Sequence, residues 1–436
     1  MAMVVKNNLQ AKNTLNQLGK NDKAKEKNLK ALATGMKINS AGDDASGLSI
    51  SERMEVQIRG LDQDNDNAQT GANMLKTAEG AVSSTVDILR TLKEKAINAA
   101  NDTNTDADRA TIQKEFDQAI DQIDENANMT YNGQTLVDGS KNRAIPQPGT
   151  RNSFANTSLY QGTTDYEFLT DLKDANGNNL GIVSTDTITV SYVKDGTTHT
   201  ASQRVGDMGL DTMRRRLGMD TDMEMISPIS DIVGTDADGN DVKTTNGLKA
   251  LAFVSVGTGT AGQITGLTIS FTDKDGKQKM NANALFNNFE ETVAPEDPSE
   301  DNAIDLQVGT KANQTVRIGL KDMRSVALGL RSVDGRTISI GTQENANTAI
   351  NVIDTALKRV LDQQTDLGSV QSRLGYTSAN IVTASENTQH AESVIRDADM
   401  AQEMTSYTKN NVLSQAAQSM LAQANQNSSA VLSLLQ

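Results

Sequence analysis

The chain has no cysteine, no tryptophan and only two histidines among its 436 residues. Without cysteine, disulfides, thiolate metal sites and thiol catalysis are excluded. His199 and His390 are far apart in sequence, and neither the H-E-x-x-H pattern of zinc proteases nor the G-x-S-x-G pattern of serine hydrolases occurs. We therefore expect no catalytic site, no cofactor and no metal.

Proline is missing from both ends of the chain, and aromatic residues are scarce there. All five prolines lie between Pro146 and Pro298, no aromatic residue precedes Phe116, and only Tyr376 and Tyr407 fall in the last third. Proline breaks helix interiors, so long proline-free ends favour helices. The pattern predicts two helical arms with a globular part inserted between them, and arms at opposite chain ends must pair with each other or with other copies.

Apolar and basic residues are also scarce. The apolar fraction is 36% and the aromatic fraction 3%, which predicts a thin core supported by pairing of helices or subunits. The net charge of −15 argues against a nucleic-acid partner. No apolar run is long enough to cross a bilayer, and residues 1–18 lack the pattern of a secretory signal peptide.

The first 37 residues nevertheless carry eight lysines against two acids. A solvated helix face explains them, and a membrane-surface helix is the alternative, although the segment has no Trp or Phe to anchor it.

The N-terminal arm has helical periodicity throughout. Leu9, Leu15 and Leu18 form a modest apolar stripe, and residues 38–47 are small and polar, which predicts a turn. Six residues then recur every seven positions, which is a coiled-coil signal: Leu61, Ala68, Leu75, Val82, Leu89 and Ala96. A helix from about Ala45 to Asn101 would span about 85 Å.

The long helix should end at Asn101–Asp106. Thr105 and Asp108 have the spacing of a capping arrangement for a next helix, whose apolar face includes Phe116 and Ile120. The sequence Tyr131–Asn132–Gly133–Gln134 predicts a turn.

The C-terminal arm mirrors the first. Ala346, Ile353, Val360, Leu367, Leu374 and Ile381 repeat every seven residues, and we expect Ile350 and Leu357 to reinforce this seam. Farther on, Val412, Ala416, Met420 and Ala424 step by four, and the chain closes on a stretch that contains Leu434 and Leu435. Such small-residue stripes bury little when alone in water, so we expect them to gain order by binding copies of the chain.

The middle of the chain has strand patterns. Ile188–Val193 and Leu267–Thr272 are β-branched, alternating segments that each meet an Asp-Gly turn, and we expect two hairpins. We expect a short helix at residues 207–216 and a linker at residues 294–301. Residues 236–241 resemble a calcium loop, but glycine stands fourth instead of sixth, which favours a β-turn.

These patterns together predict a mainly α fold. Both chain ends form a long antiparallel helical bundle or coiled coil, and a β-rich (α+β) outer domain is inserted between them.

Several motifs resemble bacterial flagellins. Residues 29–50 (LKALATGMKINSAGDDASGLSI) resemble the N-terminal signature, and residues 131–136 (YNGQTL) resemble an F-N-G-x-x-L turn. Residues 306–309, 322–323 and 327–330 resemble the hairpin that precedes the C-terminal half, and residues 398–403 (ADMAQE) resemble part of the C-terminal helix. The resemblance covers about two thirds of the chain and leaves residues 141–303 unmatched.

The resemblance implies a subunit that polymerises head to tail into the extracellular flagellar filament for swimming motility, after export through the flagellar type III apparatus. It implies five parts: an N-terminal inner-core helix (1–43), N-terminal outer-core helices and turn (44–140), a variable surface domain (141–303), a C-terminal outer-core hairpin and helix (304–390) and a C-terminal inner-core helix (391–436). The alternative is a hook–filament junction protein, which should not form long filaments alone.

The resemblance also implies partners. They are other copies of the chain, an export chaperone, cap and hook-associated proteins, and a host Toll-like receptor. The assembly contacts are expected at apolar positions of the arms: Leu9, Leu15, Leu18, Leu61, Leu75, Val82, Leu89, Ile353, Val360, Leu367, Leu374, Val412, Met420, Leu434 and Leu435.

Residues 89–101 match the helix that the receptor recognises in this family. Glu94 agrees with the family pattern, but the key arginine falls on Thr91, beside Arg90, and the key leucine falls on Lys95. A partner carboxylate falls on Glu115. We expect weakened recognition, and the alternative is that these residues only line the filament surface.

Overall fold

The computed structural model describes residues 8–433, and contacts between residues divide the chain into two compact units. Unit 1 combines the chain up to Ala68, residues Gln307–Gln314 and the chain from Tyr376 onward. Unit 2 combines Gln69–Leu306 with Thr315–Gly375. The predicted mainly α fold with an inserted β-rich region is confirmed.

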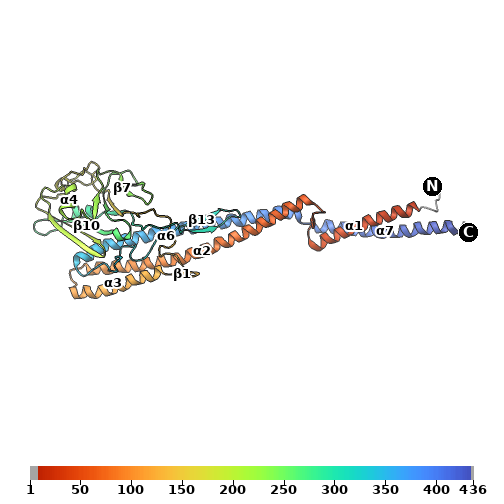
Figure 1. The fold of residues 1–436 in the computed structure, drawn as a ribbon, viewed down its shortest axis with the longest axis horizontal. Helices are drawn as coiled ribbons and strands as arrows, with labels where there is room; N and C mark the ends of the chain where they lie inside the picture. The colour runs from red at the N-terminus through yellow and green to blue at the C-terminus, as the bar shows by residue number, and fades with distance from the viewer. Residues whose placement is uncertain (1–7, 434–436) are drawn as a thin grey trace. The chain divides into compact units, whose positions relative to one another are not determined.

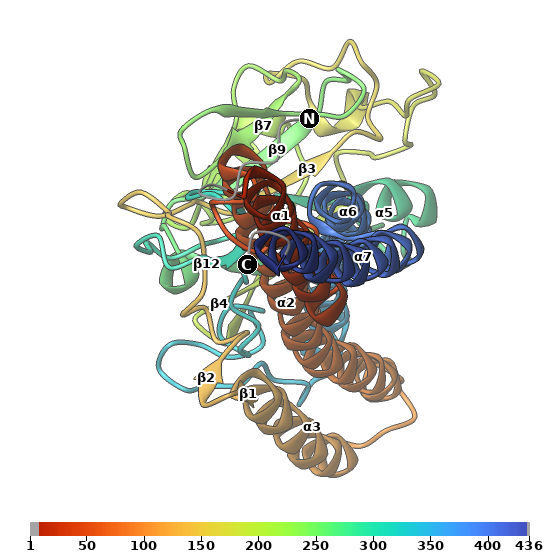
Figure 2. The ribbon, with the colours of Figure 1, turned by 90° about the vertical axis from the view of Figure 1, so that its right-hand side faces the viewer.

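Unit 1 is helical. It contains α1 (Leu9–Thr34), the start of α2 (Ala45–Ala99), the end of α6 (Gln343–Arg396) and α7 (Met400–Ser433). Helices α1 and α7 lie side by side in both views (Figures 1 and 2). Pairing between chain ends, predicted from their composition, is therefore present in this unit.

The breaks that precede α2 and α7 lie against each other. Helix α1 is capped at its C-terminal end by Gly35, whose φ of 73° is a left-handed conformation that favours glycine. The Lys37 amide donates to the Arg396 carbonyl at 2.7 Å, and the Ala398 amide donates to the Gly35 carbonyl at 2.9 Å. The small polar turn expected at residues 38–47 extends to Asp44, and α2 begins at Ala45.

The heptad positions of α2 are buried as predicted. All six residues that repeat every seven positions, from Leu61 to Ala96, are buried, and so are Ala78 and Leu92. Gly71 also lies in a close contact, because a Cβ atom there would come within 2.3 Å of the Leu306 side chain. Glycine therefore permits this close approach.

Helix α3 (Asp106–Ala127) begins at the predicted cap. The Thr105 hydroxyl accepts from the Asp108 amide, and the Asp108 carboxylate accepts from the Thr105 amide at 3.0 Å, which completes a capping box. Phe116 and Ile120 are buried, which confirms the apolar face.

One expectation for α6 is wrong. Ile353, Val360, Leu367 and Leu374 are buried as predicted, but Ile350 and Leu357 are only half-buried. The second buried row is instead Ala349, Val352 and Ala356. The small alanines fit where elements pack closely, and the bulkier residues lie at the margin of the contact.

Two small two-stranded sheets lie outside the β-rich region. Strands β1 (Thr130–Tyr131) and β2 (Gln134–Thr135) flank Asn132 and Gly133, both with positive φ, which confirms the predicted turn. Strands β12 (Ile304–Gln307) and β13 (Thr315–Ile318) form a two-stranded sheet.

The β-rich region has two main sheets. One has the order β10-β4-β5 and the other β11-β3-β9-β6, and β7-β8 is a separate hairpin. The bounds are β3 (Ser153–Asn156), β4 (Thr187–Lys194), β5 (Thr197–Arg204), β6 (Met223–Met225), β7 (Ile232–Thr235), β8 (Asp241–Lys243), β9 (Leu251–Ser255), β10 (Ile264–Thr272), β11 (Glu290–Val293), α4 (Leu210–Arg216) and α5 (Met280–Phe286), with short 3₁₀ turns at Leu169–Asp171 and Thr260–Gly262. Their core includes Phe253, Phe271 and Phe286, all buried.

The first predicted hairpin, β4–β5, is confirmed, and the second is present only as a turn closed by a single antiparallel bridge between Thr272 and Gln278. After β10 the chain turns at residues 273–277 and enters helix α5. Strand β10 pairs instead with β4, so the two similar segments are neighbours in one sheet. The short helix expected at residues 207–216 is α4.

The turn at residues 236–241 is confirmed as a β-turn within the β7–β8 hairpin. The Asp236 carboxylate accepts from the amides of Asp238 and Asn240 at 3.0 and 2.8 Å. Asp174 and Asp273 accept equivalent amide hydrogen bonds in two other turns. These carboxylates therefore stabilise backbone turns by accepting amide hydrogen bonds.

Candidate assembly and recognition surfaces

The contact between α1 and α7 is polar. Asn21 and Ser414 are buried there, and the Ser414 hydroxyl donates to the Asp22 carboxylate at 2.7 Å. The Asn410 amide donates to the Asn28 side-chain oxygen at 2.8 Å. The buried positions of these two helices combine Asn21 and Ser414 with the alanines Ala31, Ala417 and Ala424, so large apolar residues give no sign of this seam.

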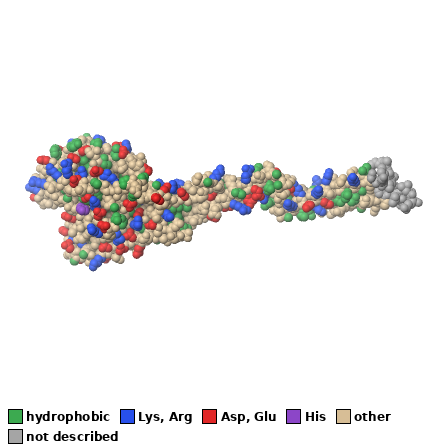
Figure 3. Space-filling view, viewed as in Figure 1, with side chains coloured by type: hydrophobic (Ala, Val, Ile, Leu, Met, Phe, Trp, Pro, Cys, Tyr) green, Lys and Arg blue, Asp and Glu red, His purple; other side chains and the backbone are tan. Residues whose placement is uncertain are grey.

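The predicted apolar stripes of these two helices face outward. Leu9 and Leu15 are 65% and 56% exposed, and Val412 and Met420 are 58% and 62% exposed. Ala424 is buried, Leu18 is half-buried, and Leu434 and Leu435 lie outside the described residues. Figure 3 shows hydrophobic side chains exposed along this pair of helices, between charged ones.

Apolar side chains that are exposed on a helix pair are free to pack against another molecule. The predicted assembly residues thus divide into two groups. Leu61, Leu75, Val82, Leu89, Ile353, Val360, Leu367 and Leu374 are buried within the chain, whereas Leu9, Leu15, Val412 and Met420 are available to a neighbour.

A buried carboxylate interrupts the α2 seam. Asp64 is 4% exposed, and one of its carboxylate oxygens is buried without a hydrogen-bond partner among the described residues. It shares a helix face with Gly60, which packs near Thr310, and with Asn67, whose amide donates to the Gln307 carbonyl at 3.2 Å. Burial raises the pKa of the Asp64 carboxyl. The heptad pattern could have indicated this residue, since it lies between Leu61 and Ala68.

The receptor-matching residues lie on the surface of α2 and α3. Arg90 pairs with Asp87 at 2.9 Å, and the Thr91 hydroxyl donates to the Asp87 carbonyl at 3.1 Å. Glu94 is exposed. Lys95 forms an ion pair with Glu115, so the structure brings together two residues 20 positions apart. A binding partner that contacts the Glu115 carboxylate must therefore displace the Lys95 ammonium group.

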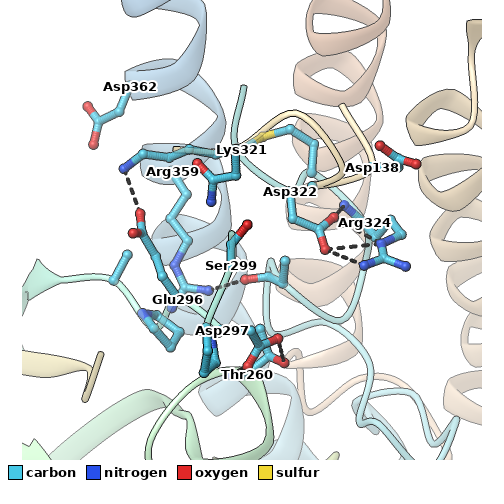
Figure 4. A pocket seen from close by; sticks show the side chains of 17 residues that line it. Asp138, Thr260, Glu296, Asp297, Ser299, Lys321, Asp322, Arg324, Arg359 and Asp362 are labelled. Carbon is cyan, nitrogen blue, oxygen red and sulfur yellow. Dashed lines mark hydrogen bonds and ion pairs between the residues drawn. The ribbon is translucent and has the colours of Figure 1, made fainter. Parts of the chain in front are cut away.

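A cleft of about 200 Å³ in unit 2 is rich in charged side chains (Figure 4). Lys321 pairs with Glu296 at 3.0 Å, and Arg324 pairs with Asp322 at 2.6 Å. The Asp297 carboxylate accepts from the Thr260 amide and hydroxyl. These groups satisfy one another, and the arrangement is typical of a structural ion-pair network.

Clusters of metal-ligating side chains and membrane-crossing helices are absent from the described part of the chain. Between residues 8 and 433, no three His, Cys, Asp or Glu side chains are placed to hold a metal ion together. Over the same range, no helix combines the length and apolar character that a bilayer crossing requires.

Comparisons with known proteins point to one family at both chain ends. Residues 5–142 match the family model of the bacterial flagellin N-terminal helical region, and residues 350–435 match that of the C-terminal helical region. A flagellin from Clostridium tyrobutyricum is 34% identical over 434 residues, covering 97% of this chain and 99% of that protein. A flagellin from Bacillus subtilis (strain 168) is 30% identical over 453 residues, covering 99% and 100%.

Solved structures add a weaker likeness. FliC from Burkholderia pseudomallei is 18% identical, with a TM-score of 0.26 over 70% of this chain and 99% of that one. FlgL from Xanthomonas campestris is 13% identical, with a TM-score of 0.32 over 79% and 99%. The family assignment rests on the sequence matches.

Proposed function

The chain belongs to the bacterial flagellin family and is a subunit of the flagellar filament. On this basis we propose which parts of the chain contact other subunits and which face solvent. Residues 1–43 and 391–436 form an inner core that contacts other subunits. Residues 44–140 and 304–390 form an outer core, and residues 141–303 form the solvent-facing domain. The family is structural, and we propose that the chain has no catalytic activity.

The exposure of Leu9, Leu15, Val412 and Met420 beside a polar α1–α7 seam carries this proposal. The chain retains its apolar side chains outside the pair, where only a neighbour can bury them. A head-to-tail contact whose rotation does not close produces an open helical filament. Ordering of the terminal helices then accompanies each addition of a subunit.

Polymerisation from seeds tests this role. Leu15→Gln with Met420→Gln should abolish growth from wild-type seeds at concentrations where wild-type chain elongates, because both side chains lose their apolar burial. The thermal midpoint of the monomer should stay within about 2 °C, since both positions are exposed in the monomer. Lys12→Gln, a change at another exposed position of α1, is the control.

Electron microscopy and light scattering give the readouts. Long filaments of the double variant would refute the assembly surface. Wild-type chain that never elongates, even on its own fragments, would favour the junction-protein alternative.

The export route and the remaining partners follow from the family. We propose that the chain is exported by the flagellar type III apparatus, meets an export chaperone, and contacts cap and hook-associated proteins in the assembled organelle. The filament then presents residues 141–303 outside the cell.

Weakened recognition by a flagellin-sensing Toll-like receptor is a second candidate activity. The Lys95–Glu115 ion pair supports it, since a lysine stands where the family has a leucine and engages the neighbouring carboxylate. An apolar anchor is lost and an acidic contact is occupied, and anchors of this kind carry much of an interface's energy.

Replacing Lys95 tests the receptor proposal. Lys95→Leu should increase signalling in receptor-reporter cells by about tenfold, because it restores an apolar anchor and releases Glu115. Lys114→Leu, on the exposed side of α3, is the matched control and should leave signalling unchanged. A wild-type response equal to that of a strongly active flagellin at the same concentration would refute weakened recognition.

A further inference from the structure

A second cleft in unit 2, of about 380 Å³, is lined by basic side chains. We name it the basic cleft and define it by Arg143, Arg317, Lys321, Gln363 and Arg373, with Asp366 as its acidic member. Helix α6 provides one wall. Strand β13 and the chain just after it provide another, and the segment at Arg143 lies alongside, since the Leu320 amide donates to the Lys141 carbonyl at 2.9 Å.

Gln363 is the buried polar group of the basic cleft. The residue is 2% exposed, and its side-chain oxygen accepts from the Lys321 amide at 3.3 Å. Its side-chain nitrogen is buried without a hydrogen-bond partner among the described residues. A buried donor left unpaired costs about 1–3 kcal/mol, so this amide is expected to meet a ligand acceptor in the cleft.

Arg143 is held at the edge of the cleft by close packing. Its stem lies against Gly319, where an added Cβ atom would come within 2.5 Å of the arginine Cγ. The guanidinium is exposed and forms no ion pair with residues 8–433. In contrast, Arg317 pairs with Asp301 at 2.6 Å and Lys321 pairs with Glu296 at 3.0 Å.

We propose that the basic cleft binds a small molecule that carries an oxyanion, a carboxylate or a phosphate. The unpaired Arg143 guanidinium and the Gln363 amide both donate hydrogen bonds, and arginine matches such oxygens with two parallel bonds. The volume corresponds to about a dozen non-hydrogen atoms, at roughly 30 Å³ for a water-sized group. Leu367 and Val370 add apolar contact on the α6 wall.

An acidic monosaccharide has this size and charge, so glucuronate is the probe. Calorimetric titration of the full-length monomer at low ionic strength should show saturable binding of glucuronate. Glucose, which lacks the carboxylate, should not bind, and inorganic phosphate should compete with glucuronate. A response to glucuronate no stronger than the response to glucose would overturn the proposal.

Three variants connect the binding to the cleft. Arg143→Gln should weaken glucuronate binding at least about tenfold, because the charge-assisted hydrogen bonds of the guanidinium are lost. Gln363→Glu keeps the acceptor for the Lys321 amide but places a carboxylate in the cleft, and it should abolish binding with the circular dichroism spectrum unchanged. Arg216→Gln, an exposed arginine of α4 outside the cleft, should bind like wild type.

The oxyanion could also be a carboxylate of a neighbouring copy. Titration of assembled filaments with glucuronate distinguishes the two sources. If wild-type filaments bind glucuronate as the monomer does, the cleft takes a free ligand. If wild-type and Arg143→Gln filaments both fail to bind it, although the wild-type monomer binds, a carboxylate of the neighbouring copy occupies the cleft. Equal binding by wild-type and Arg143→Gln monomers would place the ligand elsewhere and overturn the site.

Discussion

Asp64 shows how one residue can set the pH response of a helix seam. It occupies a buried position between Leu61 and Ala68, and the described residues offer no donor to one of its oxygens. Burial disfavours the charged form, so the pKa of its carboxyl is raised above the ordinary 3.8. An acid whose pKa is higher in the folded state makes folding more favourable as the pH falls through that value.

Replacing Asp64 should stabilise the chain. Asp64→Leu is expected to increase the free energy of unfolding by about 1–3 kcal/mol at pH 7, because it removes a buried unpaired charge and adds apolar contact. The gain should shrink as the pH falls below the raised pKa of Asp64, where the wild-type carboxyl is neutral. Denaturant unfolding at pH 7 and pH 4 measures both values.

Asp62 supplies the control for that measurement. It lies on the same helix, is exposed and accepts a hydrogen bond from Ser385 at 2.9 Å. Asp62→Leu should not stabilise the chain. A loss of stability in Asp64→Leu at pH 7 would show that the carboxylate has a stabilising partner after all.

At the scale of elements, the helices are held at their ends and flanks by buried arginines. Arg109 in α3 is buried and donates to the Ala99 carbonyl at 2.9 Å and the Asn101 carbonyl at 3.1 Å, so it satisfies carbonyls at the end of α2 and just beyond it. Arg359 in α6 pairs with Glu291 of β11, with both side chains less than a tenth exposed. Such residues attach one element to another.

Removing Arg359 should loosen the β-rich region from α6. Arg359→Met is expected to cost about 3–5 kcal/mol of unfolding free energy, because it leaves Glu291 buried and unpaired. It also removes a hydrogen bond to the Gln263 side chain at 3.2 Å. Thermal unfolding followed by circular dichroism measures the loss.

Two further variants sharpen this prediction. Adding Glu291→Leu to Arg359→Met should recover most of the stability, because the unpaired carboxylate is gone. Lys93→Met, which breaks the half-buried Lys93–Asp354 pair, should cost no more than about 1 kcal/mol. Equal losses from Lys93→Met and Arg359→Met would contradict a special role for the buried pair.

At the scale of the whole molecule, apolar side chains are distributed unequally. The α2 and α6 seams bury their leucines and valines within the chain, whereas α1 and α7 keep Leu15 and Met420 in solvent around a polar contact. Burial of apolar surface provides most of the free energy that orders a helix in water. We therefore expect the terminal helices to depend on neighbouring subunits far more than α2 and α6 do.

Limited proteolysis should reveal that dependence. In the monomer, trypsin is expected to cleave first at the lysines of residues 12–37 and at Lys409, and only later within residues 69–128. In the filament the same sites should be protected at least tenfold, because assembly buries the helices that carry them. Equal protection of these ends in monomer and filament would contradict the proposed ordering on assembly.

Much of the helical architecture is predictable from periodicity. The α2 seam, the Thr105–Asp108 cap and the turn at Asn132–Gly133 all arise from patterns a few residues long, and all are confirmed. Lys95 and Glu115 can each be identified by family resemblance. Their ion pair cannot, because it depends on how α2 and α3 pack.

The expectations that failed concern which of several similar segments pair and which of several apolar side chains are buried. The pattern at Leu267–Thr272 predicts a hairpin with the next segment of the chain, but that pairing is limited to one bridge, and the ladder of β10 is with β4, which lies far earlier in the sequence. The buried row of α6 uses Ala349 and Val352 in place of Ile350 and Leu357. Gln363 carries no pattern that identifies its buried amide.

Local chemistry along the chain specified where helices start, stop and repeat, because capping, turns and heptads are properties of neighbouring residues. Absence of proline and aromatics likewise marked the two arms. Tertiary packing decided which side of each helix is buried, which strand meets which, and which polar groups are left without partners. Those outcomes depend on contacts between residues far apart in sequence, so the outward-facing leucines of α1 and the unpaired amide of Gln363 became visible only in the folded chain.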